Sequence, residues 1–261
     1  MSEFDRDFTK KKIIFLDLDG TVYLGDNLIP GALEFLDYLK HKDICFYFLS
    51  NNSSRSKSAY VLRLKKLGVT TSEEQIILST DGVLAFLAQQ RVDQVYVVGT
   101  ESMLDMFLER GFNTTSSQPE YVILGFDTEL TYEKLKTAAL HMQNGIPLLA
   151  THPDLVCPTP SGPIPDVGAM LALFEKSTGK KPQKIFGKPN PEMVQHILTK
   201  HQATPLEVVM IGDRIYTDME LAYRLGCDSI LVLSGEARPE DLKGLSQQPT
   251  LVAESIGHIR I

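Results

Sequence analysis

Short apolar runs alternate with amphipathic stretches along most of the chain. The apolar runs expected to form buried strands are 13–16, 44–49, 95–98, 121–124, 208–211 and 229–233. The stretches with helical spacing are 31–41, 55–67, 101–110, 131–143, 167–178, 190–201 and 215–225. Regular alternation of strand and helix is typical of a parallel sheet covered by helices on both faces. The pattern therefore predicts an α/β fold.

The middle of the chain has its own alternation of strand and helix. Residues 81–182 include two of the predicted strands, and a Pro- and Gly-rich stretch at 158–168 precedes the last predicted helix of this segment. A segment of this length can bury a small core of its own. We therefore expect an inserted domain over 81–182, with 1–80 and 183–261 forming one larger domain.

Composition and charge exclude several classes of protein. The chain has 261 residues, of which 43% are hydrophobic and 23% charged, as in a globular protein with a full core. Its net charge of −7 argues against nucleic-acid binding, which needs a basic face. No run approaches the ~18 apolar residues of a membrane span. The three cysteines, which are widely spaced, and the absence of a signal-peptide core fit a cytoplasmic protein without disulfides or zinc.

Two aspartates stand at the end of the first apolar run. Side chains two residues apart in a strand share a face, so Asp17 and Asp19 can converge where that strand ends. Parallel sheets bind ligands at this edge, and buried carboxylates need a compensating cation. An acidic turn is the plainer alternative. A calcium-binding EF-hand loop is excluded, because its sixth and twelfth positions hold Val22 and Leu28.

A polar stretch follows the second apolar run. Ser50, Asn51, Asn52 and Ser53 come directly before a predicted helix. Hydroxyl, amide and backbone N–H groups at a helix N-terminus can bind an anion. An ordinary cluster of helix-capping residues is the alternative for this stretch taken alone.

Two more stretches place charged groups after apolar runs. Lys188 lies in the sequence GKPNP, ahead of a predicted helix, although a single lysine is usually exposed to solvent. Asp213 follows the run at 208–211 and Asp218 comes five residues later, where capping acids are the alternative.

Taken together and in this order, the four stretches resemble the motifs of the haloacid dehalogenase superfamily of aspartate-nucleophile phosphatases. The motifs read DLDGT, SNNS, GKP and GDRxxTD in this sequence. The chain is most similar to the class IIA branch, which includes NagD-like sugar or nucleotide phosphatases, 4-nitrophenyl phosphatases and pyridoxal phosphate phosphatases. That branch inserts its cap between the second and third motifs, where this chain has ample length. The first gap has room only for a small hairpin flap at 22–28.

The resemblance implies a Rossmann-like parallel-sheet core with an inserted α/β cap of the class IIA type. It also implies a Mg²⁺ ion held by the side chains of Asp17 and Asp213 and by the backbone carbonyl of Asp19, with Asp218 supporting the site. By this resemblance Asp17 attacks phosphorus and becomes an aspartyl-phosphate. Asp19 protonates the leaving oxygen and then activates water.

Further roles follow from the same resemblance. Ser50, Asn51, Asn52 and Lys188 would bind the phosphate. The stretch 146–162 indicates a strand that runs into a loop. By the resemblance this cap loop would face the substrate, so that His152 and Asp154 are the candidates for contacting the leaving group.

The resemblance thus predicts a Mg²⁺-dependent phosphomonoester hydrolase that acts on a small phosphorylated metabolite, such as a sugar phosphate, a nucleotide monophosphate or pyridoxal phosphate. The branch also allows a homodimer formed through the cap. A non-catalytic metabolite-binding or regulatory protein with the same fold is one alternative. A phosphotransferase or mutase is another, although mutases usually carry their cap in the first gap.

Overall fold

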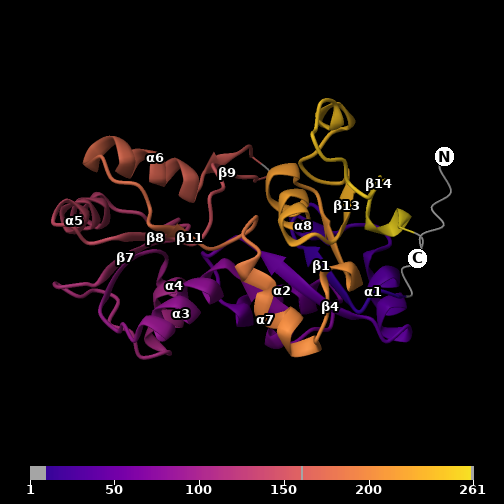
Figure 1. The fold of residues 1–261 in the computed structure, drawn as a ribbon, viewed down its shortest axis with the longest axis horizontal. Helices are drawn as coiled ribbons and strands as arrows, with labels where there is room; N and C mark the ends of the chain where they lie inside the picture. Colours follow the sequence, from indigo (N-terminus) through magenta and orange to yellow (C-terminus); the bar gives the residue numbers. More distant parts are fainter. Residues whose placement is uncertain (1–9, 160, 260–261) are drawn as a thin grey trace. The chain divides into compact units, whose positions relative to one another are not determined.

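The computed structural model describes residues 10–159 and 161–259, which form two compact units (Figure 1). Unit 1 comprises the chain up to Leu49, Val61–Ile77 and the chain from Val194 onward. Unit 2 comprises Ser50–Tyr60 and Leu78–Met193. Each unit contains one multi-stranded sheet of its own.

Unit 1 is built on a six-stranded sheet of order β14-β13-β12-β1-β4-β5. These strands are β1 (Ile13–Asp17), β4 (Cys45–Ser50), β5 (Ile76–Leu78), β12 (Val208–Gly212), β13 (Asp228–Val232) and β14 (Leu251–Ala253). Strand β1 pairs in parallel with β12 on one side and β4 on the other. All five residues of β1 are buried, as expected for an inner strand covered on both faces.

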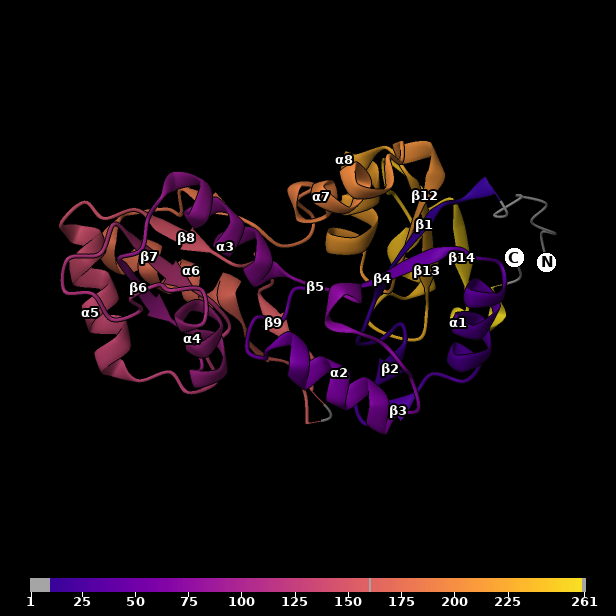
Figure 2. The ribbon, with the colours of Figure 1, turned by 90° about the horizontal axis from the view of Figure 1, so that it is seen from below.

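Helices cover both faces of the unit 1 sheet. Figure 2 shows α8 (Glu220–Leu225) above the strands and α1 (Ala32–His41) below them. Helix α7 (Glu192–His201) reaches the sheet through His201, whose Nε2 lies 2.6 Å from the Tyr47 hydroxyl of β4. Helix α2 (Lys57–Lys66) begins in unit 2 and ends in unit 1.

Unit 2 holds a four-stranded sheet of order β11-β8-β7-β6 in which neighbouring strands are parallel. The strands are β6 (Val95–Val98), β7 (Tyr121–Leu124), β8 (Leu148–Ala150) and β11 (Lys184–Ile185). The helices are α3 (Ser79–Gln90), α4 (Glu101–Leu108), α5 (Tyr132–Gln143) and α6 (Val167–Thr178). In Figure 1, α5 and α6 lie on one face of this sheet and α3 and α4 on the other.

Alternation along the strands divides the core of unit 2 into two layers. Val97 and Ile123 pack against the buried faces of α3 and α4. Their neighbours Val98 and Leu124 point the opposite way, against α5 and α6. Successive side chains of a strand face opposite sides of the sheet, so short apolar strands can serve both layers.

Two small hairpins stand outside these sheets. Strands β2 (Tyr23–Leu24) and β3 (Asn27–Leu28) pair antiparallel and confirm the hairpin expected at 22–28. Strands β9 (Val156–Cys157) and β10 (Ile164–Pro165) form the second hairpin. The remaining short elements are a π-helical turn η4 (Ile215–Met219) and the 3-10 turns η2 (Glu73–Gln75), η3 (Pro205–Glu207), η5 (Pro239–Leu242) and η6 (Ile256–His258).

The predicted α/β class is confirmed, and a strand is present at each apolar run named from the sequence. The helix expected at 215–225 differs, because it begins as the π-helical turn η4 and becomes α-helical only from Glu220. Residues 50–60, 78–80 and 183–193, which the sequence assigned to the larger domain, belong to unit 2 in the structure. The inserted domain at 81–182 stays a prediction.

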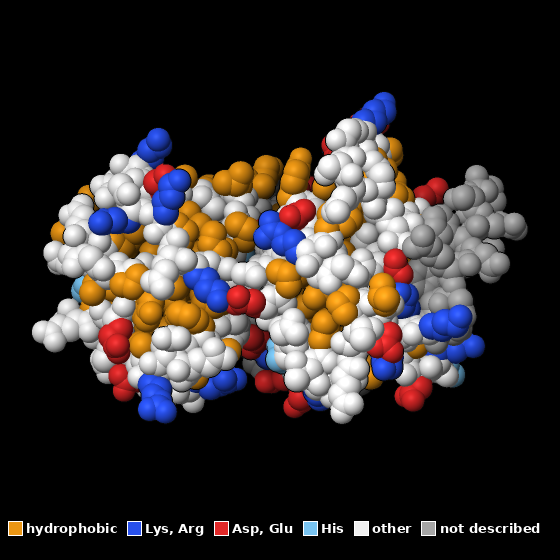
Figure 3. Space-filling model, in the orientation of Figure 1, with side chains coloured by type: hydrophobic (Ala, Val, Ile, Leu, Met, Phe, Trp, Pro, Cys, Tyr) orange, Lys and Arg blue, Asp and Glu red, His pale blue; other side chains and the backbone are white. Residues whose placement is uncertain are grey.

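Charged side chains of both signs are interspersed on the face seen in Figure 3. Among the described residues drawn there, no large tract of a single sign is visible. None of the helices within 10–159 and 161–259 combines the length and the apolar character needed to cross a membrane.

Two adjacent residues of α4 allow a test of how this helix packs in the core of unit 2. Phe107 is wholly buried, whereas Leu108 is 53% exposed. Phe107→Ala should lower the free energy of unfolding by about 3–5 kcal/mol, since it removes a large buried side chain and leaves a cavity. Leu108→Ala should change it by only about 0.5 kcal/mol. Urea denaturation of both variants measures the difference, and equal effects would contradict the packing described for α4.

Candidate active site

Three carboxylates meet at the carboxyl edge of the unit 1 sheet. Asp17 ends β1, Asp213 directly follows β12, and Asp218 lies in η4. Because β1 and β12 are parallel neighbours, their ends lie at the same edge. One ligand atom from each of the three side chains lies within 4.8 Å of the other two, and all three residues are buried. The structure thus brings Asp17 and Asp213 together, as the sequence predicted.

Asp213 lies in an environment that disfavours its ionised form. Burial raises the pKa of its carboxyl well above the usual value, and the neighbouring charges of Asp17 and Asp218 raise that pKa further. Its Oδ2 accepts a hydrogen bond of 2.7 Å from the backbone N–H of Glu236. Its Oδ1 is buried and has no hydrogen-bond partner among the described residues. A bound cation would satisfy this oxygen and relieve the repulsion.

Glycines let the backbone approach these carboxylates closely. A Cβ atom at Gly20 or Gly235 would overlap the Asp213 side chain, and one at Gly212 would overlap Asp218. Gly20 also has a φ of +88°, in the left-handed region that glycine adopts most easily. The backbone turns after Asp19, and both space and conformation require glycine there.

Asp19 lies outside the carboxylate cluster. Strand β1 ends at Asp17, so the alternation that placed both side chains on one face does not continue to Asp19. The backbone of Asp19 forms an isolated bridge with Tyr23 at the base of the β2–β3 hairpin, and its side chain is exposed. A role in proton transfer, which needs access to the substrate, stays a prediction for this residue.

In unit 2, the SNNS stretch forms a turn shaped by its own side chains. Ser50 is the last residue of β4, and its Oγ accepts a 3.2 Å hydrogen bond from the Asn52 N–H and lies 3.2 Å from the Tyr60 hydroxyl. The Asn52 Oδ1 accepts from both the N–H and the hydroxyl of Ser54, at 2.9 and 2.6 Å. Phosphate binding by Ser50 and Asn52 stays a prediction.

The side chain of Asn51 holds the backbone of Lys188. Its Oδ1 accepts from the Lys188 N–H at 2.7 Å, and its Nδ2 donates to the Lys188 carbonyl at 3.0 Å. Lys188 itself is almost completely buried. A Cβ atom at Gly187 would lie 2.5 Å from the Asn51 Oδ1, so the glycine is needed for this close approach. The sequence analysis gave Asn51 only a phosphate-binding role, and the clamp formed by its side chain was missed.

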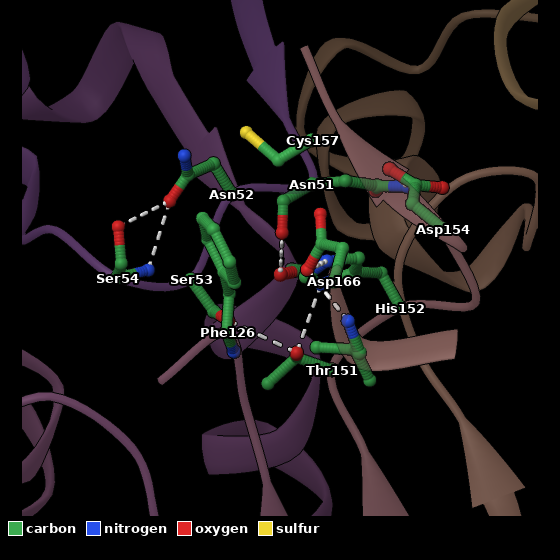
Figure 4. Close-up of polar contacts among 12 residues, drawn as sticks. Asn51, Asn52, Ser53, Ser54, Phe126, Thr151, His152, Asp154, Cys157 and Asp166 are labelled. Atoms are coloured by element: carbon green, nitrogen blue, oxygen red, sulfur yellow. Dashed lines mark hydrogen bonds and ion pairs between the residues drawn. The ribbon is translucent and has the colours of Figure 1, made fainter. Parts of the chain in front are cut away.

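His152 and Asp154 lie in the loop that follows β8 (Figure 4). The His152 ring is fully buried, with Nδ1 2.9 Å from the Thr151 Oγ1 and Nε2 2.9 Å from the Asp166 Oδ1. Asp154 is half-buried, and its two carboxylate oxygens lie 3.2 and 3.3 Å from the Asn51 Nδ2. Contact of either residue with a leaving group stays a prediction.

Asp166 is a site neighbour that the sequence analysis did not single out. It is buried, it caps the N-terminus of α6 by accepting from the Val167 N–H at 2.7 Å, and it also meets His152. The available signal was an aspartate directly before a predicted helix, which is typical of an N-cap. Nothing in the sequence pattern pairs that cap with a histidine fourteen positions earlier.

Comparison with known proteins agrees with the motifs. A family described as haloacid dehalogenase-like hydrolase matches residues 14–113, and a HAD-hydrolase-like family matches residues 185–259. An acid sugar phosphatase from Staphylococcus haemolyticus is 33% identical over 237 residues, which cover 90% of each chain.

Solved structures show the same relationship. A 4-nitrophenylphosphatase from Thermotoga maritima is 40% identical with a TM-score of 0.92, over 96% of this chain and 97% of that one. A glycerol phosphate phosphatase from Mycobacterium tuberculosis, in complex with magnesium, is 28% identical with a TM-score of 0.86, over 95% of this chain and 77% of that one. The chain belongs to the haloacid dehalogenase superfamily and is a phosphatase of the class IIA branch that its motifs indicated.

Proposed function

We propose that this protein is a magnesium-dependent phosphomonoester hydrolase that acts on small phosphorylated metabolites through an aspartyl-phosphate. The observation that carries the proposal is the cluster of Asp17, Asp213 and Asp218. Three buried carboxylates that repel one another have no structural benefit by themselves. A cation bound there would offset this repulsion and would attract the phosphate group of a substrate.

The donors present fit Mg²⁺, which prefers oxygen ligands and usually combines one or two carboxylates with waters and a phosphate. The side chains of Asp17 and Asp213 and the backbone carbonyl of Asp19 would hold the ion, with Asp218 supporting them. When bound, it supplies positive charge that offsets the carboxylates and the phosphate oxygens. The Asp213 Oδ1, which lacks a hydrogen-bond partner in the part of the chain that the structure describes, supports this assignment, and so does the magnesium complex of the Mycobacterium tuberculosis relative.

The chemical steps are assigned to the two aspartates of the first motif. A carboxylate oxygen of Asp17 attacks phosphorus, and the bond from phosphorus to the leaving oxygen breaks. Asp19 gives its proton to that oxygen and then takes a proton from the water that hydrolyses the aspartyl-phosphate. The exposure of Asp19 and the burial of Asp17 suit these roles, since the acid must reach the leaving group.

Recognition of the phosphate is assigned to Ser50, to the backbone of Asn51 and Asn52, and to the ammonium group of Lys188. The Asn51 clamp fixes the Lys188 backbone, which reduces the number of conformations open to that lysine. Such fixed donors are the main source of rate acceleration in phosphoryl transfer.

We further propose that the inserted segment 81–182 acts as the cap and selects the leaving group. The relatives named as acid sugar phosphatase and glycerol phosphate phosphatase favour a sugar or polyol phosphate as substrate. A nucleotide monophosphate and pyridoxal phosphate are the other candidates. A screen of phosphate release over a panel of phosphorylated metabolites, ranked by kcat/KM, tests this choice. Binding without phosphate release would instead support a regulatory protein.

The first prediction for the site is a metal requirement. EDTA should reduce phosphate release to background and added Mg²⁺ should restore it, because the carboxylate cluster repels a phosphate dianion. Mg²⁺ should also raise the Tm of the wild-type chain. Asp213→Asn should remove this rise, whereas Asp37→Asn, a change on the exposed surface of α1, should keep it. Full turnover in chelated buffer would contradict the proposed site.

The second prediction concerns the nucleophile. Asp17→Asn should reduce kcat to background for every substrate, since the amide cannot form the phosphoenzyme. In metal-free buffer its Tm should equal or exceed that of the wild type. The charge of Asp17 raises the pKa of Asp213, so its removal reduces the repulsion within the cluster. More than a few per cent of wild-type kcat would instead indicate direct attack by water.

The third prediction separates the two roles of Asp19. Asp19→Asn keeps the backbone carbonyl but removes the proton donor, a group typically worth ~10² to 10⁴ in rate. Sugar phosphates should show the full loss, while 4-nitrophenyl phosphate, whose leaving group needs no proton, should be cleaved once and then stall. Stopped-flow absorbance should record a burst of nitrophenolate close to one equivalent per site. Equal slowing of both substrates without a burst would refute the acid–base assignment.

A further inference from the structure

A line of buried polar side chains crosses unit 2 from the SNNS stretch to the start of α6 (Figure 4). The Ser53 Oγ lies 3.1 Å from the Thr151 Oγ1, which lies 2.9 Å from the His152 Nδ1. The His152 Nε2 lies 2.9 Å from the Asp166 Oδ1. Ser53, Thr151 and His152 are 0% exposed and Asp166 is 4% exposed. This line is called the Ser53–Asp166 network below.

The hydrogen bonds of the network can all point the same way. The Phe126 N–H donates to the Ser53 Oγ at 2.8 Å, so the serine hydroxyl can donate onward to Thr151. Thr151 then donates to the His152 Nδ1, and the Nε2–H donates to Asp166, which as a carboxylate can only accept. The His152 tautomer with a proton on Nε2 is compatible with every hydrogen bond of the network. A fully satisfied buried network restricts its members to one arrangement.

The same helix end also binds the main chain around Asp154. The Gly168 N–H donates to the Asp154 carbonyl at 2.7 Å, and the Asp166 N–H donates to the Leu155 carbonyl at 3.0 Å. A Cβ atom at Gly168 would overlap the Pro153 carbonyl. The loop therefore lies directly against the first turn of α6, and His152 ties the start of the loop to the same turn.

These attachments fix the position of the Asp154 carboxylate. Its backbone is bound to α6, and its side chain is half-buried beside the Asn51 Nδ2, the atom that also donates to the Lys188 carbonyl. The carboxylate is thus held in a defined place relative to the clamp on Lys188. An ionised carboxylate only accepts hydrogen bonds, so it favours a ligand that offers hydroxyl groups.

We propose that His152 and Asp166 are positioning residues that hold Asp154 as an acceptor for hydroxyl groups of the leaving group. The inference rests on the proposed function, because it assumes that a phosphomonoester is cleaved. His152 acts through Asp154 and does not contact the substrate, since its ring is buried and both ring nitrogens are engaged. A site built to accept from a hydroxyl discriminates strongly against a substrate that lacks one.

The kinetic test compares hydroxylated substrates with one whose leaving group has no further hydroxyl. His152→Ala and Asp166→Ala should each lower kcat/KM at least tenfold for glucose 6-phosphate and glycerol 3-phosphate. Both should lower it less than threefold for 4-nitrophenyl phosphate. Asp166→Asn should stay close to the wild type, because the amide oxygen can still accept from His152 and from the helix N-terminus.

The matched control is His141, the other histidine within unit 2. It lies on α5, and its ring contacts that of Tyr96 in a tilted arrangement, with 5.3 Å between centroids. His141→Ala should leave the ratio of kcat/KM between the two substrate types unchanged. An equal fall for both substrate types in His152→Ala, or hydrolysis of 4-nitrophenyl phosphate alone by the wild type, would overturn the inference.

Amide hydrogen exchange supplies a readout that does not depend on activity. His152→Ala should speed the exchange of the Asp166 and Gly168 amides at least tenfold, because their acceptors lie in the loop that His152 holds. His141→Ala should leave these rates unchanged. Wild-type exchange in His152→Ala would overturn the positioning role. If the wild-type chain released no phosphate from any substrate, the proposed function would fail, and exchange would still decide whether His152 positions the loop.

Discussion

The mutual repulsion of three buried carboxylates is the constraint on which the rest of unit 1 depends. At separations of up to 4.8 Å, two such charges repel by roughly 3 to 4 kcal/mol at an effective dielectric constant of about 20. The parallel pairing of β1 with β12 brings Asp17 and Asp213 to one edge, and the glycines around them let the backbone close in. The sheet core offsets the stability that the cluster removes, and the proposed cation would relieve the remaining repulsion.

The apolar runs of the sequence predicted the α/β class, and the resemblance to the haloacid dehalogenase motifs indicated Asp17, Asp213 and Asp218, which lie together in the structure. The sequence could not predict the environment of Asp19. Period-two alternation holds only within a strand, and β1 ends two residues earlier, at Asp17. Asp19 therefore differs from Asp17 in exposure although the two were read as a pair. That difference fits a division between a buried nucleophile and an accessible acid.

Helix α3 and the short strands β5, β11 and β14 were missed for identifiable physical reasons. Helix α3 begins with polar residues and contains Gly82, which reads as a turn in the sequence. The structure shows why glycine stands there, since a Cβ atom would lie 3.2 Å from Phe186. Strands β5, β11 and β14 have three, two and three residues, too few for an apolar run to be recognised. Their neighbours in the sheet, which lie far away in the sequence, stabilise them.

Asp213 and Asp166 differ in how many hydrogen-bond partners their carboxylates have. This difference distinguishes a residue that can bind a ligand from one that holds other residues in place. Both are buried aspartates next to other titratable groups. Asp166 accepts from His152 and from the N-terminus of α6, so its surroundings are complete without a ligand. Asp213 keeps one oxygen without a partner among the described residues and sits beside two like charges. An incomplete set of partners leaves an oxygen available to a ligand, whereas a complete set fixes geometry. The first arrangement suits a residue that holds a metal, and the second suits one that places Asp154.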